Sequence, residues 1–77
     1  MKIEILGTGC PKCEALAKNV EDAVRELGLD AEVTKVTDIV EIASRGVMMT
    51  PALSVDGEIK LVGKVAAAEE LKGLLTS

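Results

Sequence analysis

The sequence predicts an α/β domain whose elements follow the order βαβαββα and form a four-stranded mixed sheet with helices on both faces. Strand-like runs alternate with helix-like stripes over the first half of the chain. Later, Asp56-Gly57 separates two apolar runs and predicts a hairpin. A strand–helix–strand unit gives a parallel pair and a hairpin gives an antiparallel one, so the sheet must be mixed. The 77 residues fit one domain, residues 1–77, without a linker or a repeat.

The first strand and helix have the clearest signals. Lys2–Leu6 is rich in β-branched residues and ends at Gly7, which predicts a strand. Pro11 suits the first position of a helix, where its missing N–H is not needed. Gly28 is placed to end this helix as a left-handed cap. Apolar residues recur between these two points at steps of three and four, which predicts an inward stripe of Leu16, Val20, Ala23, Val24 and Leu27.

A second strand and a short second helix follow. Residues 31–36 contain enough β-branched side chains to predict a strand. Asp38, with Glu41 three residues later, resembles a capping box and predicts the start of a helix that Gly46 ends. The apolar residues of this helix are Ile39, Val40, Ile42 and Ala43.

The last part of the chain predicts a hairpin and a final helix. The runs 51–55 and 58–62 are expected to be its two strands, and Gly63 ends the second one. Residues 66–75 then predict a helix whose inward residues are Ala67, Leu71, Leu74 and Leu75.

The hairpin register depends on the length of its loop. A two-residue loop would pair Val55 with Glu58, whereas a three-residue loop over residues 55–57 would pair Ser54 with Glu58. We predict the three-residue loop, because it keeps the inward and outward faces of the two strands consistent.

Composition excludes several classes of function. The net charge is −4, basic residues do not cluster, and there is no Phe, Tyr or Trp to stack on bases, so nucleic-acid binding is not expected. No stretch approaches the roughly 18 apolar residues of a membrane helix, and the first apolar run is too short for a secretion signal. We therefore expect a monomeric cytoplasmic protein with neither a membrane nor a nucleic-acid partner.

The two cysteines are the candidate reactive groups. Cys10 lies where the first strand meets the first helix, and the positive end of a helix there favours a thiolate with a lowered pKa. Lys12 adds positive charge. Cys13 lies one turn further, on the same side as Leu16 and Val20, so it should be less exposed. The spacing brings the two sulfurs close enough to form a disulfide, which predicts thiol–disulfide exchange.

Two other kinds of use, a structural disulfide and a metal site, remain open for the cysteine pair at this point. As a structural disulfide, the pair would close a very short loop and contribute little stability. As a zinc site, it supplies only two ligands, and with no His and no third Cys a second chain would be needed. A two-thiolate Cu(I) carrier of the copper-chaperone kind is the main alternative, because soft thiolates suit that ion. No resident metal or other cofactor is expected.

A wider pattern resembles a known family. Cys10-Pro11-Lys12-Cys13 stands at the first strand–helix junction, and Thr50-Pro51 opens the third strand, before a hairpin and a last helix. This combination resembles the thioredoxin fold over the whole chain, and its length resembles the small glutaredoxin-like thioredoxins, also called redox-active disulfide proteins. Small copper chaperones have a βαββαβ order instead and lack the Thr-Pro pair.

The resemblance implies a thiol–disulfide oxidoreductase. In the family, the residue matching Cys10 is the nucleophile and that matching Cys13 is the resolving thiol, while Pro11 and Lys12 modulate them. The bond before Pro51 is expected to be cis, with the Thr50 backbone presented to an extended substrate. The implied partners are disulfide-containing proteins and an electron donor of the thioredoxin-reductase type.

Some positions depart from the family pattern. No aromatic residue precedes Cys10. Glu4 stands six residues before Cys10, where larger thioredoxins bury a carboxylate, but we predict a solvated strand residue. The last helix lacks the Gly-Gly pair of glutathione-binding glutaredoxins, so glutathione is not favoured as a partner. Met48 and Met49 could form an apolar rim for a partner.

Overall fold

The predicted α/β architecture is confirmed by a computed structural model that describes residues 1–76. The sheet has the order β2-β1-β3-β4, with β1 parallel to β2 and antiparallel to β3, and β3 antiparallel to β4. The elements are β1 (Lys2–Leu6), α1 (Pro11–Leu27), β2 (Glu32–Val36), α2 (Ile39–Ser44), β3 (Ala52–Val55), β4 (Glu58–Val62) and α3 (Ala68–Thr76).

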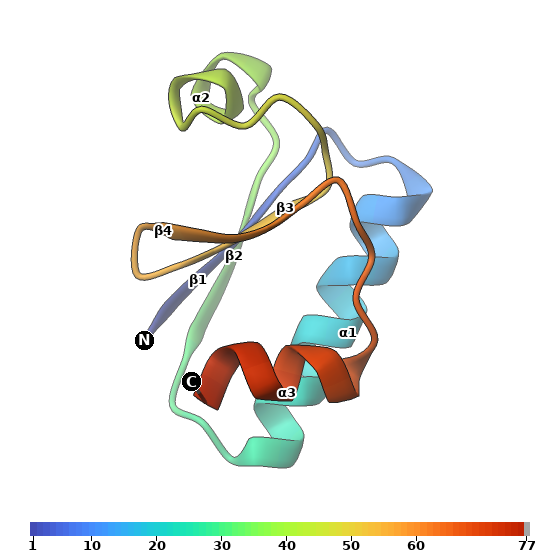
Figure 1. Ribbon diagram of the computed structural model, residues 1–77, viewed down its shortest axis with the longest axis vertical. Coiled ribbons are helices and arrows are strands. Elements are labelled where there is room, and N and C mark those ends of the chain that lie inside the picture. The colour runs from blue at the N-terminus through green and yellow to red at the C-terminus, as the bar shows by residue number, and fades with distance from the viewer. Residues whose placement is uncertain (77) are drawn as a thin grey trace.

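Helices lie on both faces of this sheet. Helices α1 and α3 lie together on one side, and α2 lies apart from them at one end of the sheet (Figure 1). Alternate residues of each strand point to opposite faces, so the strands contribute to two cores. The core under α1 and α3 includes Ile3, Ile5, Leu16, Val20, Leu53 and Leu71. The smaller core under α2 consists of Leu6, Ile42, Val47 and Ala52.

Helix α1 begins and ends where the sequence predicts. Cys10 is its N-cap in an extended conformation, and Pro11 is its first residue. Gly28 adopts a left-handed conformation with φ of 66°. The N–H of Leu29 donates to the carbonyl of Val24, so the last turn closes in the manner of a Schellman motif.

Helix α2 is short and only weakly buried. The Asp38 side chain accepts a hydrogen bond of 2.9 Å from the Val40 N–H, which caps the first turn. Only Ile42 of its apolar residues is buried, whereas Ile39 and Val40 are 68% and 73% exposed. The helix therefore covers the sheet with one side chain and leaves an apolar surface facing solvent.

The three-residue hairpin loop predicted from the sequence is wrong. Val55 pairs with Glu58, so the loop has two residues, Asp56 and Gly57. Both have positive φ, 51° and 86°, as a type I′ turn requires. This turn matches the right-handed twist of the two strands better than the longer loop does.

A bulge in β4 keeps the faces of β3 and β4 consistent, which was the reason for predicting the longer loop. Ser54 pairs with Ile59, but the next residue, Leu53, pairs with Leu61, so Lys60 is an extra residue in β4. As a result Ile59 packs against the α2 core and Leu61 against the α1 core. The sequence pattern alone assumed an unbroken ladder, which is why it favoured the wrong loop.

The last helix begins later than predicted. Helix α3 starts at Ala68 instead of residue 66, and Ala67 is exposed although it was expected to face inward. Ala66 is buried in its place, in the segment that leads into the helix. Leu71 and Leu75 are buried as predicted. No helix within residues 1–76 is both long enough and apolar enough to cross a membrane.

Candidate active site

The two cysteines lie at the N-terminal end of α1. Cys10 is partly exposed at the N-cap, and Cys13 is 5% exposed one turn inside the helix. Both thiols are free, and their sulfur atoms lie 2.8 Å apart. Pro11 and Lys12 occupy the exposed first turn between them. The helix start therefore presents one sulfur to solvent and keeps the other beneath it.

The surroundings shift the pKa values of the two thiols in opposite directions. The pKa of Cys10 is lowered, chiefly because the Cys13 thiol donates a hydrogen bond to its sulfur, with help from the backbone N–H groups of Cys13 and Lys12. The pKa of Cys13 is raised, first because burial disfavours its thiolate and second because of the hydrogen bond with Cys10. Between the two pKa values, Cys10 carries the negative charge and Cys13 keeps its proton.

The segment before β3 comes close to Cys13 at Gly7. A side chain on Gly7 would collide with the Cys13 sulfur and would lie 3.9 Å from the Pro51 Cα, so these three residues converge. The Thr50–Pro51 peptide bond is cis. Pro51 is buried and its carbonyl accepts a hydrogen bond from the Gly63 N–H, whereas Thr50 is exposed. The residues that resemble the family's substrate platform thus stand beside Cys13.

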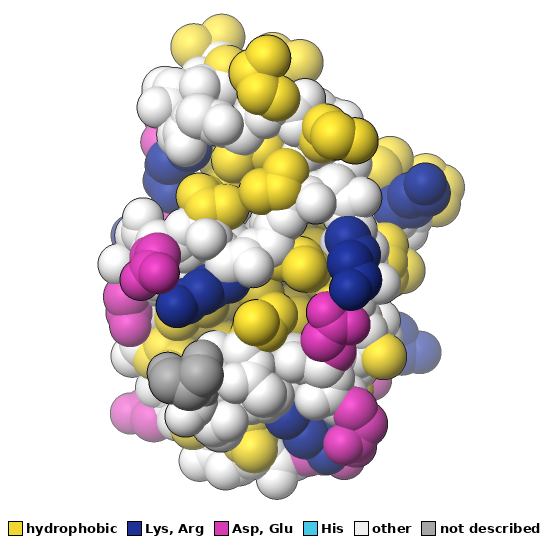
Figure 2. Space-filling model, viewed as in Figure 1, with side chains coloured by type: hydrophobic (Ala, Val, Ile, Leu, Met, Phe, Trp, Pro, Cys, Tyr) yellow, Lys and Arg dark blue, Asp and Glu magenta, His cyan; other side chains and the backbone are white. Residues whose placement is uncertain are grey.

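An apolar surface adjoins this point. Hydrophobic side chains gather over α2 and the segment that leads to β3, while charged side chains lie mainly on the opposite half of the same face (Figure 2). The large exposed hydrophobic residues of these segments are Ile39, Val40, Met48 and Met49. Met48 is 92% exposed, and Met49 lies against Gly63, whose N–H donates to the Pro51 carbonyl.

Comparison with known proteins decides which family this site belongs to. The Thioredoxin domain family matches residues 1–76. A protein named thioredoxin from Methanothermobacter thermautotrophicus is 49% identical over 76 residues, which cover 99% of both chains. Another, from Methanocaldococcus jannaschii, is 51% identical over 75 residues, covering 97% of this chain and 86% of the relative. The chain belongs to the thioredoxin family.

This membership fits the site geometry. The two cysteines form the C-x-x-C motif at the place that the resemblance implied, so the protein is a thiol–disulfide oxidoreductase, as the sequence predicted. The element order βαβαββα also differs from the βαββαβ order of the copper chaperones that the alternative required. Within residues 1–76, no group of three or more His, Cys, Asp or Glu side chains is arranged to hold a metal ion.

The surroundings of Glu4 differ from those that the sequence predicts. The prediction that Glu4 is a solvated strand residue is wrong, because Glu4 is only 7% exposed. Arg45 donates two hydrogen bonds to its carboxylate, of 2.7 and 3.0 Å. This hydrogen bonding lowers the pKa of Glu4 even though burial alone would raise it. Glu4 alternates with Ile5 along β1 and so lies on the α2 face, away from the face that α1 covers.

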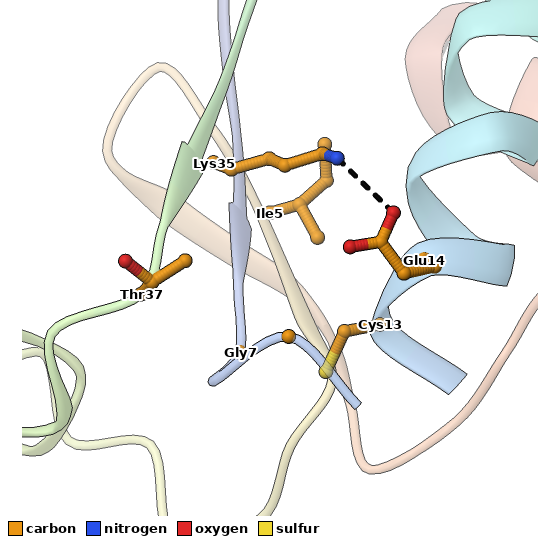
Figure 3. Close-up of a pocket in the computed structure, with 7 residues that line it drawn as sticks. Ile5, Gly7, Cys13, Glu14, Lys35 and Thr37 are labelled. Carbon is orange, nitrogen blue, oxygen red and sulfur yellow. Dashed lines mark hydrogen bonds and ion pairs between the residues drawn. The ribbon is translucent and has the colours of Figure 1, made fainter. Parts of the chain in front are cut away.

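A small pocket on the α1 face contains charged residues that sequence reasoning missed. It is lined by Cys13, Glu14 and Lys35, together with Ile5, Gly7, Gly9 and Thr37. Figure 3 shows Lys35 of β2 reaching past Ile5 to the carboxylate of Glu14, with the Cys13 sulfur turned toward Gly7. Lys35 is 21 residues from Glu14, and only the parallel pairing of β1 with β2 brings it there.

Proposed function

We propose that the protein reduces disulfide bonds of other proteins, with Cys10 as the attacking thiol and Cys13 as the resolving thiol. The Cys10 thiolate attacks one sulfur of the substrate disulfide, and the other substrate sulfur leaves as a thiolate. Cys13 then loses its proton and attacks Cys10, which releases the second substrate thiol and leaves a Cys10–Cys13 disulfide. Two electrons pass from the protein to the substrate, and a donor must return them.

One observation carries this assignment of roles. The partly exposed Cys10 sulfur at the helix N-cap lies 2.8 Å from the buried Cys13 sulfur, and their pKa values are shifted in opposite directions. A substrate reaches Cys10 first, because Cys13 is only 5% exposed. Cys13 is near enough to resolve the mixed disulfide without a large movement of the helix.

The surface around the site supports a protein substrate. We propose that Thr50 and Pro51 hold an extended segment of the substrate and that Met48 and Met49 contact its apolar side chains. The methionines are exposed, and their flexible thioethers adapt to varied partners. Pro11 and Lys12, on the exposed first turn, would border the same segment and modulate Cys10.

The remaining partners follow from the same proposal. Both relatives are named thioredoxin, so a thioredoxin-reductase-type protein is the proposed electron donor, and glutathione is not favoured. We place the protein in the cytoplasm, because a reducing compartment keeps such dithiols available. We also propose that it acts as a monomer.

Trapping of the mixed disulfide tests the proposed roles. The Cys13→Ser variant should accumulate a covalent adduct with a disulfide-containing protein through Cys10, because the thiol that releases the partner is absent. The matched Cys10→Ser variant should trap little. Mass spectrometry of non-reduced samples would identify both the adduct and the attached cysteine. Equal trapping by the two variants would refute the assignment, and tightly held metal in the same samples would favour the copper-carrier alternative.

A further inference from the structure

The proposed exchange leaves the proton of Cys13 without an acceptor. Cys13 must become a thiolate to attack Cys10, yet its sulfur is buried and its pKa is raised. Glu4 does not line the pocket beside Cys13, and both of its carboxylate oxygens accept hydrogen bonds from Arg45. The acceptor must therefore be reached from the α1 face, where the pocket beside Cys13 lies.

The pocket beside Cys13 offers such a route. Its volume is about 20 Å³, which is room for roughly one water molecule. A buried water needs two to four polar partners. The polar side chains that line the pocket are Cys13, Glu14, Lys35 and Thr37, so the thiol and a carboxylate border the same space.

Lys35 and Glu14 form an ion pair at this pocket. Lys35 Nζ lies 3.2 Å from Glu14 Oε2, and the two side chains are 50% and 60% exposed. An exposed pair of this kind contributes about 0–1 kcal/mol to stability. Its position is more informative than its strength, because both side chains line the pocket that Cys13 also lines and both are partly exposed to solvent.

We propose that Glu14 accepts the proton of Cys13 through a water in this pocket and that Lys35 is a positioning residue for the Glu14 carboxylate. This inference rests on the proposed function. The Cys13 S–H bond gives its proton to the water, which passes one to Glu14. The Cys13 sulfur then forms a bond to Cys10, the bond between Cys10 and the substrate sulfur breaks, and that sulfur leaves with the electron pair. Glu14 returns its proton to the departing thiolate or to solvent.

Few ionisable groups compete for this role. Those that contact Cys13 or line its pocket are Cys10 and Glu14 from the start of α1 and Lys35 from β2. From β1 and the segment before β3 the neighbours are Ile5, Gly7 and Pro51, which carry no charge. Cys10 cannot act as the base in this step, because it is then bonded to the substrate.

A reaction with two phases separates the attack by Cys13, which Glu14 should assist, from the attack by Cys10, which it should not. The reduced protein is mixed in a stopped-flow instrument with dithiobis-nitrobenzoate, an aromatic disulfide that releases a coloured thiolate. The first release reports attack by Cys10, and the second, independent of reagent concentration, reports attack by Cys13. Glu14→Gln should leave the first phase unchanged and slow the second about tenfold at neutral pH. This is less than the 10²–10⁴-fold typical of a base in direct contact, since solvent can partly replace it.

The pH profile and matched variants distinguish this role from a structural one. The deficit of Glu14→Gln should vanish at alkaline pH, where Cys13 ionises without help. Glu21→Gln, the same change of charge on an exposed residue of α1, should behave like the wild type. Lys35→Met should slow the second phase less than Glu14→Gln and add nothing to it in the double variant.

Each other outcome has a definite meaning. Equal slowing of both phases by Glu14→Gln, a deficit that persists at alkaline pH, or rates equal to those of Glu21→Gln would overturn the role of Glu14. A wild-type protein without a concentration-independent second phase would instead overturn the role of Cys13 in the proposed function.

Discussion

Glu4 has a long-range partner that the sequence does not reveal. It stands in an alternating strand, where a charged residue normally faces solvent, but Arg45 from the end of α2 covers it. Arg45 is 41 residues away and also contacts Glu41 on its own helix. A local pattern carries no information on such a partner. The pair joins β1 to the end of α2, immediately before the segment that leads to Pro51.

The Glu4–Arg45 pair should matter to stability. Arg45→Met keeps most of the apolar stem but leaves a buried carboxylate without a partner, so the free energy of unfolding should fall by about 2–4 kcal/mol. Urea unfolding at neutral pH measures this. The control is Arg25→Met, which removes an exposed pair with Asp22 and should cost about 0–1 kcal/mol. Similar losses in the two variants would contradict the prediction.

The same pair predicts how stability depends on pH. Because the pKa of Glu4 is lowered in the folded protein, the unfolded chain binds more protons in mild acid. The stabilisation is therefore complete above the ordinary Glu range, near pH 4.3, and is lost as the pH falls through the lower value of the folded state. Arg45→Met should lack this part of the acid dependence. Unfolding midpoints measured from neutral to strongly acidic pH would reveal a slope in the wild type that the variant does not share.

At the scale of elements, local signals decided most of the fold. Pro11 and Gly28 set the bounds of α1, and Asp38 caps α2 as expected. The errors arose where two elements had to fit each other. The bulge at Lys60 and the burial of Ala66 in place of Ala67 depend on what lies across the sheet or under α1. Periodicity cannot reveal these adjustments, because they are set by packing.

Two glycines should respond oppositely to the same substitution. In Gly7→Ala the new Cβ collides with the Cys13 sulfur, so the free energy of unfolding should fall by about 1–3 kcal/mol and the Cys13 step should change. In Gly73→Ala the new Cβ meets nothing within 4 Å and lies inside α3, so stability should rise by about 0.5–1 kcal/mol. Thermal and urea unfolding of both variants test the pair. Loss of stability in Gly73→Ala would contradict the open surroundings described here.

At the scale of the whole molecule, the sequence predicted the candidate site residues but not their neighbourhood. The C-x-x-C spacing and Thr50-Pro51 were visible in the chain, because each is a local motif. Their convergence at Gly7 and the charged pocket next to Cys13 come from the sheet order, which joins residues far apart in sequence. The apolar surface was predicted only at the methionines, since Ile39 and Val40 were named only as apolar residues of the short second helix and are exposed in the structure.

The methionines should affect large substrates more than small ones. Met48→Gln and Met49→Gln each remove apolar contact with a docked protein, and kcat/KM for a protein disulfide should fall about 3- to 10-fold per substitution. The rate with dithiobis-nitrobenzoate should not change, because that reagent needs little docking surface. Insulin reduction in the presence of a chemical reductant measures the first rate. An equal loss with both substrates would place the effect on the cysteines instead.

The sheet order also has a consequence for the protein while it is being made. The ribosome releases Cys10 and Cys13 early, but the central strand β1 completes its pairing only when β3 emerges, about fifty residues later. Pro51, which lies close to Gly7 and Cys13 in the folded protein, emerges only just before β3. Until then both thiols of the nascent chain are open to any oxidant or metal ion in the surrounding fluid. The newborn protein therefore has to rely on its compartment, not on its own fold, to keep the dithiol reduced.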